Sequence, residues 1–332
     1  MAHVKRISLA LALLFAVSLG IYVQQGLSSR TPPLSIRIAV SQTPLSTPFY
    51  VAQHKGYFKD QDIEVELVPY VGGHLCFQAL TNGKVDLATT SDSVIMFNSF
   101  DRRDFSILSS FVESDNDIKV ISPAPLKIRE PGQLRGRRVG VIHNTASEFF
   151  LHSLLLISGI SPQNIELVSL RPDEMSAALI SGQIDAASVW EPYAYEALQE
   201  STPPPNVINA RGMYTLSFNL VSMRPQASNQ LTEHRKVLAA LGEAIRYIAK
   251  QPKEAQKIIA QQLQRNPNAI AHSWDDYVFK LSLSNSLIST LESEARWAVS
   301  QHRVSAASIP DYRTFIDDTA LSATEPAASL IR

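Results

Sequence analysis

The sequence has 332 residues, which is enough for about two domains of ordinary size. Hydrophobic residues make up 45% and charged residues 18%, with 13 glycines and 19 prolines, so the composition excludes a disordered, collagen-like or repeat protein. Thirty basic and 31 acidic side chains give a net charge of -1, so no overall field directs the chain to nucleic acid or to an anionic membrane. Its single cysteine, Cys76, excludes an internal disulfide and is expected as a small buried hydrophobe, and the Cys and His spacings of a structural zinc site are absent.

The N-terminus has the pattern of an export signal. Lys5 and Arg6 precede an apolar run that extends to Val23, and a polar stretch follows. We therefore expect residues 1–23 to be a signal peptide or an N-terminal membrane anchor, followed by a linker over residues 24–34. Cleavage after Gly20 departs from the Ala-x-Ala pattern, whereas the uncut segment falls slightly short of the roughly 20 residues that cross a bilayer. Both alternatives place the rest of the chain outside the cytoplasm.

Short β-branched runs alternate with helical patterns after the linker, which predicts βαβ units. Residues 35–125 should form the first part of one lobe. Its expected strands are residues 36–40, 63–68, 85–88 and 107–112, with residues 118–121 closing the series, and its expected helices are residues 49–58, 74–82 and 93–100.

The pattern restarts at the turn Pro131-Gly132, which predicts a second lobe over residues 126–213. Its expected strands are residues 138–142, 165–169 and 184–190, and its expected helices are residues 146–157, 173–180 and 192–198. A strand over residues 214–223 should then lead the chain back, so the chain is expected to cross twice between the lobes.

Residues 214–332 should complete the first lobe and are mostly helical in pattern. The expected helices are residues 231–250, 252–264, 273–283 and 287–300. Their single apolar stripes favour packing over the first lobe, with an independent helical bundle as the alternative. The predicted fold class is α/β, with two lobes that each contain a mainly parallel sheet flanked by helices.

Three stretches, taken together, resemble a known family. They are the segment Pro48-Phe49-Tyr50-Val51-Ala52-Gln53-His54-Lys55-Gly56-Tyr57-Phe58, the segment from Ala79 to Asp92, and the segment Leu134-Arg135-Gly136-Arg137-Arg138-Val139-Gly140-Val141 with its later partners Ala178 to Ala187 and Trp190-Glu191-Pro192-Tyr193. The chain resembles the periplasmic binding proteins of ATP-driven importers that serve sulfonates, taurine, nitrate and thiamine precursors. The resemblance covers nearly the whole chain after residue 34.

The resemblance implies a type II periplasmic binding protein, with a ligand cleft between the lobes that closes by hinge motion. It implies an exported, monomeric component of an ABC transporter, with a small polar organic ligand and with permease and ATPase subunits as partners. No catalytic residues, metal or cofactor are expected, because none of the common nucleophile, phosphate-loop or metalloprotease motifs occurs. A membrane-tethered ligand sensor remains an alternative. So does an enzyme on the same fold, similar to thiamine-pyrimidine synthase or to menaquinone-pathway enzymes.

In such a fold, the loops at the carboxyl ends of strands line the cleft, and helix N-termini point free N–H groups into it. The first lobe offers polar residues at three such places. Candidate ligand-binding residues there are Gln42, Thr43, His74, Thr90 and Ser91. Helix capping explains one of Ser91 and Asp92 equally well.

The second lobe contributes a polar loop before its first helix and the end of a later strand. Candidate ligand-binding residues there are His143, Asn144, Thr145, Trp190 and Glu191, together with Tyr214 on the returning segment. Trp190 can stack on a ligand and Glu191 can accept a hydrogen bond from an amine, or the pair braces the hinge. A carboxylate in the cleft disfavours a simple anion as the ligand.

Overall fold

The computed structural model describes residues 34–224, 229–305 and 308–331. Residues 35–332 form one compact unit that holds both sheets. The predicted signal peptide or anchor and its linker, residues 1–33, lie outside the described residues. Among the helices that are described, none has both the length and the apolar character needed to cross a membrane.

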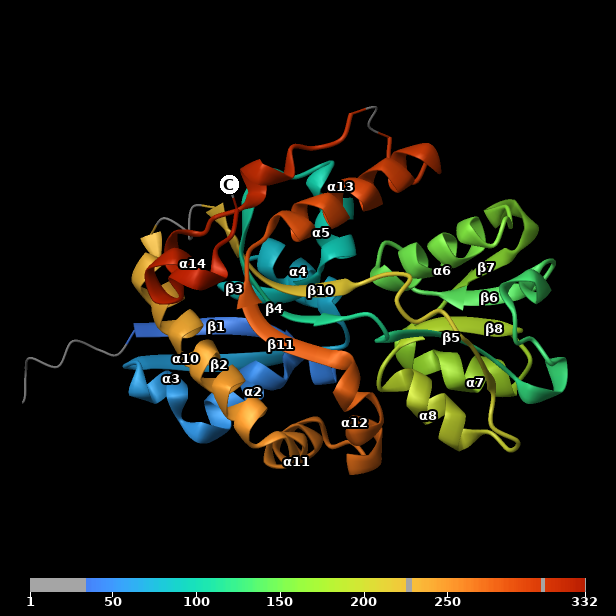
Figure 1. Ribbon diagram of the computed structural model, residues 1–332, viewed down its shortest axis with the longest axis horizontal. Helices are drawn as coiled ribbons and strands as arrows, with labels where there is room; N and C mark the ends of the chain where they lie inside the picture. The colour runs from blue at the N-terminus through green and yellow to red at the C-terminus, as the bar shows by residue number, and fades with distance from the viewer. Residues whose placement is uncertain (1–33, 225–228, 306–307, 332) are drawn as a thin grey trace, which may run out of the picture. The chain divides into compact units, whose positions relative to one another are not determined.

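One sheet has six strands in the order β11-β4-β10-β3-β1-β2 (Figure 1). Its strands are β1 (Leu34–Ser41), β2 (Ile63–Tyr70), β3 (Leu87–Ser91), β4 (Phe105–Ser114), β10 (Leu216–Met223) and β11 (Tyr277–Ser282). β1 and β3 are parallel, whereas β10 runs antiparallel to both β3 and β4. The sheet is therefore mixed, because β10 brings the chain back from the other lobe in the opposite direction.

The second sheet has five strands in the order β7-β6-β8-β5-β9. Its strands are β5 (Ile118–Ser122), β6 (Arg138–Val141), β7 (Glu166–Ser169), β8 (Ala186–Trp190) and β9 (Asn206–Ile208). β6 is parallel to β7 and β8, and β5 is antiparallel to β8 and β9. The sequence pattern assigns residues 118–121 to the last strand of the first lobe. In the structure, this strand is β5, which pairs with β8 and β9 in the second sheet. The predicted lobe boundaries at residues 125/126 and 213/214 stay predictions.

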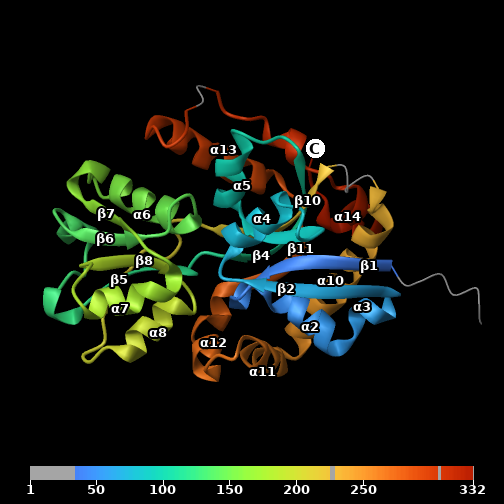
Figure 2. The same ribbon diagram turned by 180° about the vertical axis from the view of Figure 1, so that it is seen from behind.

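Helices flank both sheets, which confirms the predicted two-lobed α/β fold (Figure 2). They are α2 (Thr47–Lys55), α3 (Tyr57–Asp60), α4 (Gly73–Thr81), α5 (Asp92–Ser99), α6 (Ala146–Ile157), α7 (Met175–Ile180), α8 (Tyr193–Glu200), α10 (Leu231–Lys250), α11 (Pro252–Leu263), α12 (Pro267–Ser273), α13 (Asn285–Ser300) and α14 (Thr319–Thr324). Short 3₁₀ turns join several of them, among them η1 (Pro44–Ser46) and η6 (Trp274–Asp276).

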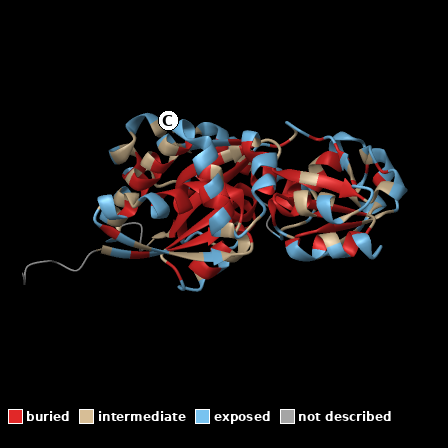
Figure 3. Ribbon diagram, turned by 90° about the horizontal axis from the view of Figure 1, so that it is seen from below, coloured by how far each residue is buried: buried red, intermediate tan, exposed pale blue. Residues whose placement is uncertain are grey.

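The C-terminal helices pack over the six-stranded sheet, as their apolar stripes predict. α10 and α11 contact α2, and α13 contacts α5. The chain end joins the same core: Tyr312 and Phe315 are fully buried, and Phe315 lies 5.0 Å from Phe105 between ring centroids. Figure 3 shows the buried residues concentrated on the strands and on the inner faces of the helices.

One predicted helix, residues 273–283, is wrong. Ser273 is the last residue of α12 and the only residue of the predicted range that lies in an α-helix. Tyr277–Ser282 forms β11 at the edge of the six-stranded sheet, antiparallel to β4. Tyr277 is buried and Phe279 is partly buried, while Val278 and Lys280 are exposed. This is the two-residue period of an edge strand, and in so short a segment a helical stripe can imitate it.

Candidate functional site

A cavity of about 30 Å³ lies between the two sheets. Its wall comes from both lobes and from the crossing between them, and it is mostly apolar. The lining residues are Thr43, Leu45, Gly72, Gly73, His74, Ser91, Val94, Asp117, Ile118, Thr145, Ala146, Trp190, Leu216 and Phe218. We call this the interlobe cavity.

Three helices begin at the wall of the interlobe cavity. Gly72 precedes α4, Ser91 caps α5 by accepting a hydrogen bond from the Val94 N–H at 3.4 Å, and Thr145 caps α6 by accepting one from the Ser147 N–H at 3.3 Å. The first N–H groups of a helix have no partner inside the helix, and the helix dipole makes this end positive. Ser91 and Thr145 take up one N–H group each, and the positive helix ends favour an acceptor-rich ligand group on this side of the cavity.

Two glycines allow α4 to start close to β3. Gly72 has a φ of +91°, which L side chains rarely adopt. A Cβ on Gly73 would lie 2.7 Å from Phe218 Cζ and 2.9 Å from Thr90 Cα. Glycine at both positions thus lets the backbone approach the strand, and it brings His74 to the cavity wall.

His74 and Trp190 face each other from opposite lobes, with ring centroids 6.3 Å apart. Neither His74 Nδ1 nor Trp190 Nε1 has a hydrogen-bond partner among the described residues, although both atoms are buried. Burial lowers the pKa of His74 from its usual value. Buried polar atoms are rarely left unpaired. The neutral imidazole of His74 and the indole N–H of Trp190 are therefore available to form hydrogen bonds with a polar ligand group.

Thr43 and Thr90 are both buried, but they differ in what their hydroxyl groups contact. Thr43 lines the cavity, and its Oγ1 lies 2.7 Å from the Ser41 hydroxyl. Thr90 stands behind the wall, and its Oγ1 has no partner among the described residues. Gln42 does not line the cavity; its backbone N–H donates to Tyr70 O at 2.9 Å.

His143 and Asn144 also lie off the wall, although they precede α6. His143 Nδ1 lies 3.2 Å from Glu148 Oε1, and the Asn144 N–H donates to Glu148 Oε2 at 2.8 Å. Glu148 is fully buried, and its Oε1 also pairs with Arg303 Nη2 at 2.5 Å. His143 and Asn144 thus help to fix the first turn of α6, and their role as ligand contacts stays a prediction.

Tyr214 is buried beside two carboxyl groups and does not line the interlobe cavity. Its hydroxyl donates to Asp92 Oδ1 and lies 3.2 Å from Glu294 Oε1. Burial and the neighbouring Asp92 raise the pKa of Glu294 well above its usual value. Tyr214 therefore ties β10 to α5 and α13.

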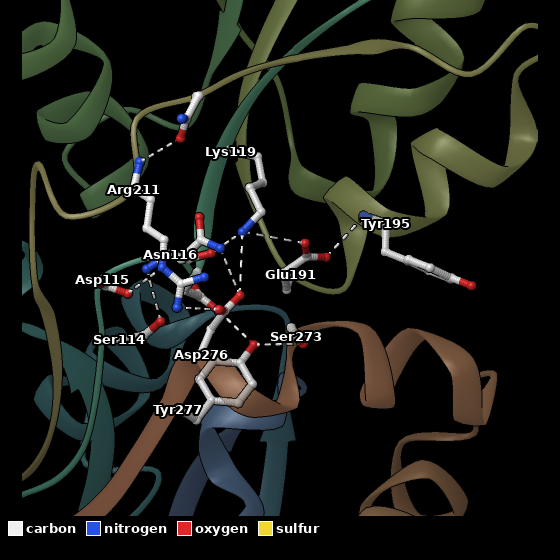
Figure 4. Close-up of polar contacts among 12 residues, drawn as sticks. Ser114, Asp115, Asn116, Lys119, Glu191, Tyr195, Arg211, Ser273, Asp276 and Tyr277 are labelled. Atoms are coloured by element: carbon white, nitrogen blue, oxygen red, sulfur yellow. Dashed lines mark hydrogen bonds and ion pairs between the residues drawn. The ribbon is translucent and has the colours of Figure 1, made fainter.

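Glu191 follows β8 but is turned away from the cavity. Its side chain is fully buried, Oε2 accepts a hydrogen bond from the Tyr195 N–H at 3.0 Å, and Oε1 lies 4.0 Å from Lys119 Nζ (Figure 4). Burial raises the pKa of Glu191 to about 7, and Lys119 opposes the rise. These contacts match the hinge-bracing interpretation of the sequence.

Lys119 belongs to a polar cluster at the place where the chain crosses between the sheets (Figure 4). Its Nζ donates to Asn116 O and lies 3.8 Å from Asp276 Oδ2, while Arg211 Nη2 pairs with Asp276 Oδ1 at 3.0 Å. Asn116 and Arg211 come from the two crossing segments, and Asp276 from the turn before β11. The cluster holds both crossings to the six-stranded lobe.

Asp117 is a second ionisable residue on the wall, in addition to His74, and no sequence pattern predicts it. It lies between β4 and β5, is buried, and accepts a hydrogen bond on Oδ1 from the Tyr277 hydroxyl at 2.9 Å. Burial raises its pKa to about 7. No sequence motif marks it, because its position on the wall depends on β5 joining the second sheet.

Of the predicted residues, the structure brings Thr43, His74, Ser91, Thr145 and Trp190 together on the wall. The apolar residues Leu45, Val94, Leu216 and Phe218 were not predicted, since their strands and helices give no sign of which side chain faces a cavity. In the part of the chain that the structure describes, no group of three or more His, Cys, Asp or Glu side chains is arranged to hold a metal ion. Cys76 is fully buried, as expected.

Comparison with known proteins identifies relatives among binding proteins. The chain is 26% identical over 162 residues to a putative aliphatic sulfonates-binding protein of Bacillus subtilis, a match that covers 48% of each chain. It is 25% identical over 167 residues to the taurine-binding periplasmic protein of Escherichia coli, covering 50% of this chain and 51% of that one. The chain thus spans about half the length of these two relatives. Both are named as binding proteins, which agrees with the expectation that the chain is not an enzyme.

Solved structures share the fold. The aliphatic sulphonate binding protein SsuA of Escherichia coli matches with a TM-score of 0.72 at 19% identity, covering 86% of this chain and 97% of that one. The nitrate-binding protein NrtA of Synechocystis PCC 6803 matches with a TM-score of 0.71 at 11% identity, covering 90% of each. These similarities confirm the periplasmic binding protein fold.

A family model described as NMT1/THI5 like matches residues 43–255, more than half of the chain. The matched range begins at Thr43 on the cavity wall and includes every strand of the second sheet. This chain belongs to the NMT1/THI5-like family.

Proposed function

We propose that the chain is the extracytoplasmic solute-binding component of an ABC importer, and that it binds a small organic molecule with a polar group in the interlobe cavity. The observation that carries the proposal is that both lobes contribute residues to the wall of the interlobe cavity. Thr43, His74 and Ser91 come from one lobe, and Thr145 and Trp190 come from the other. A ligand that contacts both sets stabilises the closed arrangement over an open one.

Two ion pairs link the lobes in the closed arrangement. Arg303 follows α13 and pairs with Glu148 on α6, while Arg265 follows α11 and pairs with Glu196 on α8 at 2.6 Å. The Arg265–Glu196 pair is partly exposed on both sides and contributes little on its own, whereas the carboxylate of the Arg303–Glu148 pair is fully buried and links the lobes more firmly. The ligand then supplies the difference in free energy that favours closure.

The polar group of the ligand is proposed to bind the N-termini of α4, α5 and α6 together with Trp190 Nε1 and His74. Its apolar part is proposed to contact Leu45, Val94 and Phe218. Alkanesulfonates, taurine, nitrate and aminopyrimidines are the candidates that the family suggests. A permease and an ATPase are the proposed partners.

The proposed location is the periplasm, because a relative is named as periplasmic and Lys5 and Arg6 precede an apolar run. Fractionation of cells that express the full chain should recover it with the periplasmic contents or on the outer face of the cytoplasmic membrane. N-terminal sequencing then distinguishes a cleaved signal from an anchor. Recovery in the cytoplasm would contradict the proposed location.

Ligand binding is tested by titration calorimetry and by Trp190 fluorescence. The mature chain is titrated with ethanesulfonate, taurine, nitrate and 4-amino-2-methylpyrimidine. At least one should bind and change the fluorescence, and Trp190→Phe should remove that change while Trp297→Phe keeps it. If none binds at millimolar concentration, the proposed function fails.

A further inference from the structure

The wall of the interlobe cavity carries an unusual set of charges. Among its fourteen lining residues, Asp117 is the only acid, and none is Lys or Arg. His74 is the only other ionisable group on the wall, and its lowered pKa keeps it neutral near pH 7. A ligand bearing only negative charge would therefore meet a carboxyl group and no cationic side chain.

Asp117 is held in place, yet one of its carboxyl oxygens is left for a ligand. Its main-chain oxygen accepts a hydrogen bond from the Glu191 N–H at 3.1 Å, and Oδ1 accepts one from Tyr277. No hydrogen bond from the described residues is directed to Oδ2, and no described Lys or Arg forms an ion pair with Asp117. The nearby cation Lys119 is directed to Asn116, Asp276 and Glu191 instead.

Trp190 lies on the same cavity wall as Asp117. Ile118 pairs with Trp190 across β5 and β8, and Asp117 directly precedes Ile118, so both wall residues come from the same end of the second sheet. A carboxylate together with an aromatic face is a favourable environment for an amine, through an ion pair and a cation–π contact. The helix N-termini on the rest of the wall carry a partial positive charge, so they favour an acceptor-rich or negatively charged group.

We infer that the ligand is a small dipolar molecule that carries a nitrogen-bound hydrogen-bond donor at one end and an acceptor-rich group at the other. The donor binds Asp117 on the wall that also carries Trp190, and the acceptor group binds the N-termini of α4, α5 and α6. Asp117 is thus the residue that distinguishes an amine-bearing ligand from a simple anion. This inference rests on the proposed function and narrows its ligand.

Binding of such a ligand is coupled to proton exchange at Asp117. With a pKa of about 7, roughly half of the Asp117 carboxyl groups carry a proton at neutral pH before the ligand binds. An ammonium group placed against Asp117 lowers its pKa, so binding releases protons and the affinity rises as the pH increases from 6 to 8. A simple anion placed there would raise the pKa of Asp117, so its binding would take up protons and its affinity would fall as the pH increases. The groups that face Asp117 are Tyr277 from β11, Lys119 from β5, Asp276 from η6 and Glu191 from the end of β8.

Two pairs of probes test the inference. Taurine and ethanesulfonate differ only in the ammonium group, and 4-amino-2-methylpyrimidine and 2,4-dimethylpyrimidine differ in the amine. Calorimetry in two buffers of different ionisation enthalpy gives the affinity and the protons exchanged. Asp117→Asn removes the only acid among the lining residues of the wall. Glu191→Gln makes the same change in the same cluster, but off the wall, and serves as the matched control.

In at least one pair, the amine-bearing probe should bind at least about tenfold more tightly than its partner, with proton release when the probe is taurine. Asp117→Asn should abolish that preference, and Glu191→Gln should preserve it. If the amine-free probe or nitrate binds as well or better, or if Asp117→Asn leaves the preference unchanged, the inference is wrong while the binding function stands. If no probe binds, the proposed function fails, and the inference with it.

Discussion

Gly73 shows how a single residue shapes the interlobe cavity. The absence of a side chain lets α4 begin against Thr90 and Phe218, and His74 follows directly on the wall. Gly73→Ala would place a methyl group within 2.7 Å of Phe218 Cζ and 2.9 Å of Thr90 Cα, so ring and backbone must shift. We expect a loss of about 1–3 kcal/mol in the free energy of unfolding, together with weaker ligand binding.

Urea unfolding measures this effect, and Gly132→Ala is its control. A Cβ added to Gly132 would have nothing within 4 Å, so this replacement should change stability by no more than about 0.5 kcal/mol. Equal stability of the two variants would show that the close approach of α4 to β3 is unimportant.

At the scale of elements, the clearest interlobe contact joins α6 to the segment after α13. Arg303 is the cationic partner of the fully buried Glu148 carboxylate, and it is 30% exposed. Replacing it with methionine removes the charge but keeps much of the apolar stem. Because the pair links the two lobes, Arg303→Met should favour the open form and weaken the affinity for a cavity ligand by roughly three- to tenfold.

Arg296→Met provides the matched control for this prediction. Arg296 lies on α13 itself and pairs with Glu292 of the same helix at 3.6 Å, so it makes no interlobe ion pair. Small-angle X-ray scattering without ligand should show a larger radius of gyration for Arg303→Met only. The same radius for both variants would contradict a latching role for the Arg303 pair.

The elements also show how far the sequence predicts this site. Strand, polar loop and helix follow one another at Ser91 and at Thr145, and that local order places both residues correctly at helix N-termini on the wall. Asp117 and Glu191 could not be assigned in the same way. Which of these two carboxyl groups reaches the cavity depends on the pairing of β5 with β8, a non-local contact that leaves no local pattern.

At the scale of the whole molecule, buried carboxyl groups at the crossing link stability to pH. Burial raises the pKa of Glu191 from 4.5 to about 7, so the folded state binds its proton more tightly than the unfolded chain does. The stabilising effect is therefore complete below about pH 4 and is lost as the pH rises through 7. His234 has the opposite effect: its pKa falls to about 4, so it reduces stability as the pH decreases from 6.5 to 4.

Glu191 and His234 change protonation over overlapping pH ranges and with opposite effects on stability. The informative quantity is therefore the difference in the free energy of unfolding between wild type and Glu191→Gln. Glutamine cannot ionise. Above pH 7 the variant therefore avoids the free-energy cost that the wild type bears for burying a carboxylate, whereas at pH 5 the wild-type carboxyl is protonated and the variant has no such advantage. The free energy of unfolding of Glu191→Gln relative to wild type should therefore rise between pH 5 and pH 8, by up to about 3 kcal/mol. Urea unfolding across this range measures it. A flat difference would mean that Lys119, 4.0 Å away, keeps the Glu191 carboxylate ionised throughout, so that the hinge cluster would not respond to pH through this residue.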